Sequence, residues 1–137
     1  MHKIITALFI SLSAMVYSQD APVEAPRIAI KAPLGEAIKI DHVSIKLLEV
    51  LEDSRCPSDV TCIWAGQAKV NVEVMVDGKD SYTKELLFTS KMSGQDVQKT
   101  LFTNEEFFLE GLSLSPYPTS ETRGKLEYVL LVGKGPN

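Results

Sequence analysis

The segment E-D-S-R-C-P-S-D-V-T-C-I-W-A-G, residues 52–66, decides the fold. It contains both cysteines of the chain and its single tryptophan, and strand-like sequence lies on either side of it. Pro57 restricts the backbone and Ser58-Asp59 favours a turn. We therefore expect residues 52–66, here called the corner, to link two strands of a β-sandwich.

Cys56 and Cys62 are expected to form a disulfide that closes the loop of residues 56–62. By the chain-entropy model, closing so small a loop stabilises the fold by roughly 2–2.5 kcal/mol. A redox role is an alternative, although the spacing is not that of a C-x-x-C motif. A zinc site is disfavoured because two thiols and the distant His42 do not have the spacing of zinc ligands.

The other corner residues are expected to have structural roles. One carboxylate, of Asp53 or Asp59, is expected to pair with Arg55. Trp64 is expected to pack on the disulfide, because in extended chain it shares a face with the second cysteine, while an exposed binding aromatic is the alternative. Gly66 is expected to permit a close approach or a bulge. Carboxylates and turn carbonyls suit Ca²⁺, but their spacing matches no calcium loop, so no metal or cofactor is expected.

The N-terminal residues predict export. Lys3 precedes a mostly apolar run over residues 4–16, and Val16 and Ser18 suit a signal-peptidase site. The apolar run is shorter than the roughly 20 residues that a membrane-spanning helix needs. We expect residues 1–18 to be a signal peptide and the mature protein to be periplasmic or extracellular. Two cysteines in an exported chain also suggest a disulfide.

The charge excludes one class of partner. The chain has a formal net charge of −4, and removal of residues 1–18 with their one lysine makes it −5. Nucleic-acid binding needs clustered Lys and Arg, which this chain lacks. No second segment is apolar enough to span a bilayer, so we expect an unknown protein or small ligand as partner.

Alternating apolar residues predict about seven strands in a domain over residues 27–133, between a tether (19–26) and a tail (134–137). The predicted strands are residues 27–32, 36–40, 43–51, 68–76, 80–88, 105–115 and 125–132. Residues 89–104 are expected to be loop-like. Several short strands without a helix favour an all-β, antiparallel, immunoglobulin-like sandwich. An antibody-type disulfide is excluded because the cysteines lie only six positions apart.

Some strands allow a prediction of which face is buried. Val70, Val72, Val74 and Val76 alternate with polar residues, and Asp77-Gly78 then indicates a hairpin. After the hairpin, a longer loop or a bulge would place Tyr82, Leu86 and Phe88 on the same face as these valines. Further apolar residues share a face in each of two later predicted strands. These are Phe108, Leu112 and Leu114 in the first, and Leu126, Tyr128, Leu130 and Val132 in the second. A switch of parity at Leu47-Leu48 predicts a β-bulge.

Catalytic motifs are missing from the sequence. His42 is the only histidine after the signal peptide, so a Ser-His-Asp triad would have to use it. The chain has no G-x-S-x-G, no H-E-x-x-H and no glycine-rich phosphate loop. We therefore expect a protein that is not an enzyme.

The stretch D-S-R-C-P-S-D-V-T-C-I-W-A-G-Q-A, residues 53–68, resembles a motif of small exported bacterial β-proteins of unassigned function, D-S-R-C-P-x-x-V-x-C-x-W-A-G. This resemblance implies an exported bacterial β-protein and carries over no catalytic or binding residues.

Three functions are compatible with these features. The leading hypothesis is a non-catalytic binding or interaction module that uses its loops. The second is a secreted inhibitor, for instance of proteases, that presents the disulfide-closed loop of residues 56–62 as a preorganised bait. The third is a redox protein that uses Cys56 and Cys62.

Overall fold

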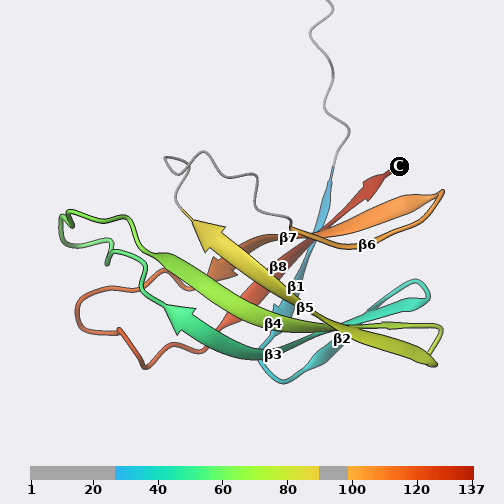
Figure 1. Ribbon diagram of the computed structural model, residues 1–137, viewed down its shortest axis with the longest axis horizontal. Helices are drawn as coiled ribbons and strands as arrows, with labels where there is room; N and C mark the ends of the chain where they lie inside the picture. The colour runs from blue at the N-terminus through green and yellow to red at the C-terminus, as the bar shows by residue number, and fades with distance from the viewer. Residues whose placement is uncertain (1–26, 90–98) are drawn as a thin grey trace, which may run out of the picture.

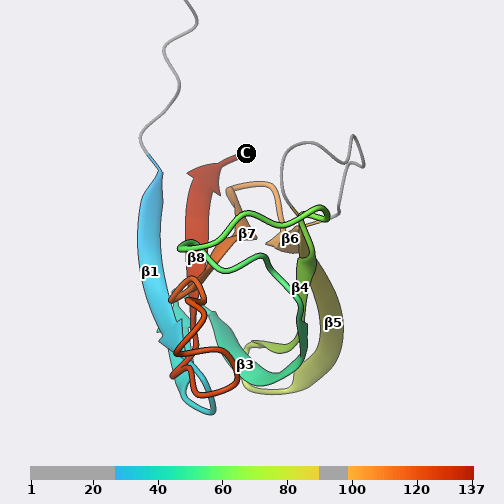
Figure 2. The same cartoon turned by 90° about the vertical axis from the view of Figure 1, so that its left-hand side faces the viewer.

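In the computed structural model, which describes residues 27–89 and 99–137, the chain forms two antiparallel sheets of four strands packed face to face (Figures 1 and 2). The predicted all-β, antiparallel sandwich is confirmed, with eight strands in the described residues where about seven were predicted. In chain order the strands are β1 (Ile28–Pro33), β2 (Ala37–Ile40), β3 (Val43–Asp53), β4 (Gln67–Val76), β5 (Asp80–Thr89), β6 (Thr100–Thr103), β7 (Phe107–Ser115) and β8 (Val129–Pro136). The predicted signal peptide (1–18) and tether (19–26) lie outside the described residues.

Each sheet is largely a meander. One has the order β2-β3-β4-β5, and the other has the order β1-β8-β7-β6, in which β1 joins by pairing antiparallel with β8. β1 is therefore an edge strand, a position in a sheet where a proline such as Pro33 is tolerated. β6 lies within the segment that was expected to be a loop, where Leu101 is fully buried. No helix in the described part of the chain is long and apolar enough to cross a membrane.

The central strand β4 behaves as its alternation predicts. Val70, Val72 and Val74 are fully buried, whereas Val76 at its end is half-buried. Three residues separate β4 from β5, since Val76 pairs with Asp80, and this loop sets the register. The predicted longer loop is therefore confirmed.

The face of β5 differs from the prediction at one position. Leu86 and Phe88 are buried as expected, but Tyr82 is 38% exposed. The Tyr82 hydroxyl donates a hydrogen bond to the carbonyl of Leu101, 2.8 Å away. The side chain thus bridges β5 and β6 at the open edge of the sandwich, where a polar tip keeps its partner and part of the ring stays in water.

Strand β3 contains the predicted bulge. Its pairing with β4 shifts between Leu47 and Glu49, and a second shift follows between Val50 and Glu52. Leu47 is buried and Leu48 is exposed. The extra residue bends the strand and changes its buried parity, so that Leu47 before the bulge and Val50 after it both pack against the core.

The predicted face of β7 is wrong for two of its three residues. Phe107 and Leu109 are buried in place of Phe108 and Leu112, whereas Leu114 is buried as expected. Phe107 and Leu109 have odd numbers, whereas Leu114 has an even one. A register shift between Gly111 and Ser113 allows all three to be buried, because it returns Leu114 to the core side.

Strand β8 is longer at its C-terminal end than predicted. The residues expected to form a tail, 134–137, belong to β8 as far as Pro136, and Lys134 pairs with both Ile28 and Leu109. Leu130 and Val132 are buried as predicted. Leu126 and Tyr128 are half-buried but precede the strand.

Candidate binding tip at the disulfide corner

The corner lies at one end of the sandwich, between the end of β3 and the start of β4 (Figure 1). The loop between β7 and β8, residues 116–128, lies at the same end, and the two are joined by hydrogen bonds. The amide of Ser58 donates to the carbonyl of Pro118 at 2.9 Å. The two loops therefore form one structural unit.

A buried ion pair anchors the first half of the corner. The Arg55 guanidinium donates through Nε and Nη2 to the two carboxylate oxygens of Asp53, each at 2.7 Å. Their side chains are only 7% and 8% exposed. The prediction that a carboxylate pairs with Arg55 is confirmed, and the partner is Asp53. Such fork-to-fork contacts are among the stronger hydrogen bonds in proteins.

Arg55 also ties the corner to the other sheet. Its Nη1 donates to the carbonyl of Leu114 at 2.7 Å, and Nη2 donates to that of Pro116 at 3.1 Å. The guanidinium carbon lies 4.8 Å from the centroid of the Tyr117 ring. Because β7 ends beside these carbonyls, Arg55 joins β3 to the β7–β8 loop across the end of the sandwich.

The ionisation of Asp53 follows from these contacts. Burial by itself raises the pKa of Asp53, but the hydrogen bonds from Arg55 and Tyr128 outweigh it and hold the pKa below the usual value. The Tyr128 hydroxyl donates to Asp53 at 3.0 Å. Burial and this anionic neighbour raise the pKa of Tyr128.

The first residues of the disulfide loop pack against the protein. Cys56 and Cys62 are bonded, as predicted, with 5.9 Å between their Cα atoms. Pro57 is buried, and both carboxylate oxygens of Asp59 accept hydrogen bonds from Ser120, one from its amide at 2.8 Å and one from its hydroxyl. These bonds lower the pKa of Asp59.

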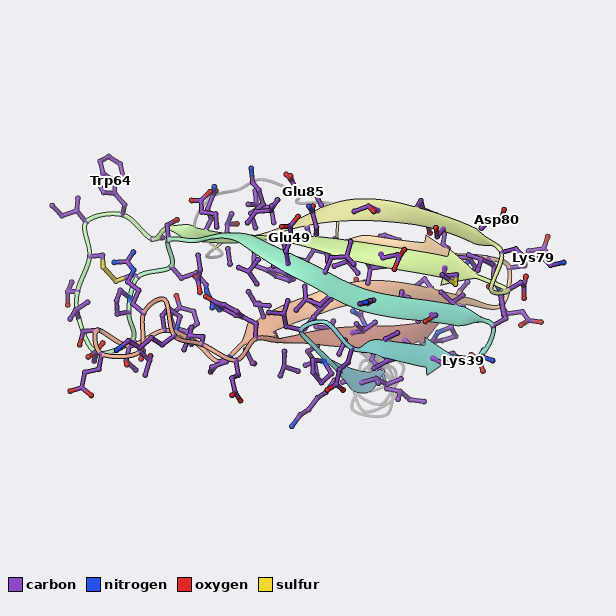
Figure 3. The ribbon with its side chains drawn as sticks, turned by 90° about the horizontal axis from the view of Figure 1, so that it is seen from below. Lys39, Glu49, Trp64, Lys79, Asp80 and Glu85 are labelled. Atoms are coloured by element: carbon purple, nitrogen blue, oxygen red, sulfur yellow. A yellow bond between two sulfur atoms is a disulfide. The ribbon has the colours of Figure 1, made fainter. Side chains whose placement is uncertain are left out.

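The second half of the corner is exposed. Residues 60–65, here called the tip, include Val60, Ile63 and Trp64, and the side chains of Ile63 and Trp64 are 93% and 82% exposed. Trp64 points away from the sandwich into solvent (Figure 3). The prediction that Trp64 packs on the disulfide is therefore wrong. Residues 54–66 form no strand, so the two-residue alternation behind that prediction does not apply.

Gly66 closes the base of the corner. Its φ is +66°, and a Cβ at this position would lie 1.8 Å from the carbonyl oxygen of Ser54. The amide of Ser54 donates to the carbonyl of Gln67 at 2.8 Å, so the two chain segments cross closely here. The predicted close approach is confirmed, and only glycine satisfies both conditions.

The structure does not bring His42 to the corner. His42 lies in the β2–β3 turn at the opposite end of the sandwich, where its ring contacts Phe102 and Phe107 edge-on at 5.7 Å. Within the described ranges, no cluster of three histidine, cysteine or acidic side chains is placed to hold a metal ion.

The partners of the corner were missed by sequence reasoning. Tyr128 and Ser120 lie more than 60 positions away from the acids that they contact. No local sequence pattern identifies such distant partners. The one signal in the sequence is an arginine beside a cysteine pair in a polar loop, which indicates that other side chains must contact the corner. Comparison with protein-family models, curated proteins and solved structures finds no match to this chain. The resemblance to exported bacterial β-proteins stays a prediction.

Proposed function

We propose that this protein is an exported, non-catalytic binding module that binds its partner through the tip. The observation that carries this proposal is the exposure of Ile63 and Trp64. Large apolar side chains that the fold leaves in water are often interaction sites, and tryptophan is enriched among the residues that dominate binding energy. No residue in the segment 60–66 carries a charge, so a partner would cover it without desolvating an ion.

The corner holds this apolar segment in place before any partner binds. The disulfide closes the loop, the Asp59–Ser120 hydrogen bonds fix its first half, and Arg55 anchors its base. A preorganised loop loses little conformational entropy on binding, which favours affinity. This supports a binding role over a purely structural one for the tip.

Export is part of the same proposal. A disulfide persists in oxidising compartments such as the periplasm or the extracellular medium. The Cys56–Cys62 bond is compatible with such a location. The apolar N-terminal run and the resemblance of residues 53–68 to exported bacterial proteins support it.

Affinity capture from the native exported fraction tests the binding role. The wild-type protein and the Trp64→Ser variant serve as baits, with Ile28→Ser as matched control because Ile28 is 62% exposed on β1, outside the tip. We expect one partner to be retained by the wild type and the control and lost by Trp64→Ser. Its titration should shift Trp64 emission to shorter wavelength. Equal capture by all three baits would contradict the proposal.

A protease inhibitor is the second candidate, favoured by the rigid attachment of the loop. Residues 57–59 pack against the β7–β8 loop, so a bait would have to be the exposed segment 60–65 rather than the whole loop of residues 56–62. An inhibitor of this kind should slow chymotrypsin-like proteases and lose that effect on reduction. Rapid cleavage within residues 60–65 without inhibition would exclude it. A redox role for Cys56 and Cys62 stays a prediction.

A further inference from the structure

A cleft of about 190 Å³ opens between the two sheets beneath the corner. Its walls are mainly apolar, and its lining includes Phe88 of β5, Leu112 and Leu114 of β7, and Tyr117 of the following loop. An apolar cavity of about 150 Å³ accommodates a benzene ring, so this cleft is large enough for one six-membered ring and a small polar group.

Two glycines allow close chain packing around this cleft. Gly66 lines the cleft where the corner begins β4. Gly111 lies beside it, and a Cβ there would be 2.6 Å from Leu86 and 3.3 Å from the ring of Phe88. The bulge of β7 that follows Gly111 then places Leu112, Ser113 and Leu114 in succession along the cleft.

Lys99 is the cationic group of the cleft. Its carbonyl accepts a hydrogen bond from the Gly111 amide at 2.8 Å, which fixes the Lys99 backbone beside the bulge of β7. Its ammonium lies 5.6 Å from the centroid of the Phe88 ring. Over the described residues, 27–89 and 99–137, no carboxylate forms an ion pair with Lys99.

The other charged lining residue contributes little net charge. The Arg55 guanidinium pairs with Asp53 and donates its remaining hydrogen bonds to the Leu114 and Pro116 carbonyls. Among the described residues, Lys99 therefore gives a mainly apolar cleft one positive charge that no carboxylate compensates. Ser113 lines the same space, and its hydroxyl makes no hydrogen bond within the described part of the chain.

We propose that this cleft is a second binding site, for a small monoanion with a flat apolar body such as a monocyclic aromatic carboxylate. The ring would lie against Phe88 and the two leucines, and the carboxylate would pair with the Lys99 ammonium and accept a hydrogen bond from Ser113. A mostly apolar pocket with a few convergent polar groups is the usual form of a small-molecule site. Of the tip residues only Ala65 lines the cleft, and Ile63 and Trp64, which carry the proposed function, do not.

Titration with benzoate at constant ionic strength, followed by amide chemical shifts of the folded protein, tests this proposal. We expect saturable shifts at Gly66, Leu112 and Leu114 and none at Gly78, which lies in the β4–β5 hairpin. Small ligands of this size bind with dissociation constants on the order of 1 mM. Benzamide, the uncharged isostere, should bind at least about fivefold more weakly, the effect of a partly exposed ion pair.

Substitutions of Lys99 distinguish a specific site from a general electrostatic attraction between benzoate and surface lysines. Lys99→Gln should weaken benzoate binding about fivefold, whereas Lys99→Arg should retain it. Lys125→Gln makes the same charge change on an exposed residue outside the cleft and should have no effect. Trp64→Ser should also bind benzoate normally, so the two sites can fail independently. Absence of saturation, equal binding of benzamide, or equal weakening by Lys125→Gln would overturn the proposal.

Discussion

The two halves of the corner invert the usual rule of burial. In the first half a charged side chain, Arg55, is 6% exposed, while in the second half an apolar one, Trp64, is 82% exposed. The buried arginine has a carboxylate and two carbonyls as partners, which compensate the cost of removing it from water. The exposed tryptophan has no such role in the fold. The first half thus stabilises the structure, and the second half leaves large apolar side chains exposed to solvent.

The largest effect is expected from the first half. Asp53→Asn leaves Arg55 buried without a counter-ion, and breaking a buried pair in this way costs about 3–5 kcal/mol. Urea unfolding of the variant should show this loss as a lower free energy of unfolding. Asp77→Asn, on the exposed β4–β5 turn, is the matched control and should stay within about 0.5 kcal/mol of the wild type. A loss below about 1 kcal/mol for Asp53→Asn would mean that Arg55 does not anchor the corner.

The disulfide joins the two halves and should have the next largest effect. Reduction should lower the free energy of unfolding by roughly 2–2.5 kcal/mol and decrease the melting temperature, because the unfolded chain regains the freedom of the closed loop. A Cys56→Ala/Cys62→Ala variant should melt at the reduced temperature with or without reductant.

Two outcomes would change the interpretation of the disulfide. Easy reduction that leaves the melting temperature unchanged would favour the redox hypothesis for Cys56 and Cys62. Free thiols at both positions in exported protein would contradict the structural role.

Acid should destabilise the first half of the corner, because it protonates Asp53. The pKa of Asp53 in the folded protein lies below the value of 3.8 that is usual for aspartate. The stabilisation from its charge is therefore complete above the unfolded-state pKa and is lost as the pH falls through the lower folded-state pKa. Between about pH 5 and about pH 2 the wild type should lose more stability than Asp53→Asn, so the two should converge. Parallel pH profiles would contradict this linkage.

The smallest effect on stability is expected at the tip. Trp64→Ser should change the free energy of unfolding by less than about 0.5 kcal/mol, because the fold makes no use of this side chain. The wild-type emission should already be that of a solvent-exposed tryptophan and should shift little on unfolding. A large blue shift in the folded state would show that Trp64 is buried.

The parts of the fold that could be predicted are those where one local pattern decides the outcome. The valines of β4 alternate with polar residues, so only one face can be apolar and its burial follows directly. In β7 the run F-F-L-E-G-L-S-L carries apolar residues on both parities. Its buried face is decided by the bulge after Gly111, a tertiary feature that no local pattern specifies. β6, with four residues, was too short to distinguish from loop.

At the candidate site, the sequence predicted which residues take part better than it predicted their burial and their contacts. The cysteine pair, the pairing of Arg55 with one of two nearby carboxylates and the close approach at Gly66 were predictable from residue types and spacing. The burial of Arg55 was not, because its partners at Leu114 and Pro116 are 59 and 61 positions away. The orientation of Trp64 was predicted wrongly because the parity argument assumed an extended strand.

The pairing of β1 with β8 also determines how the molecule can be attached to something else. Ile28 lies beside Lys134, so residue 27 and residue 137 emerge together, whereas Pro33 and Val129 lie at the end that carries the corner. The eight residues of β8 separate these ends by roughly 25 Å. A linker, an affinity tag or an immobilising surface joined directly at residue 27 or residue 137 would therefore leave the tip facing outward and unobstructed.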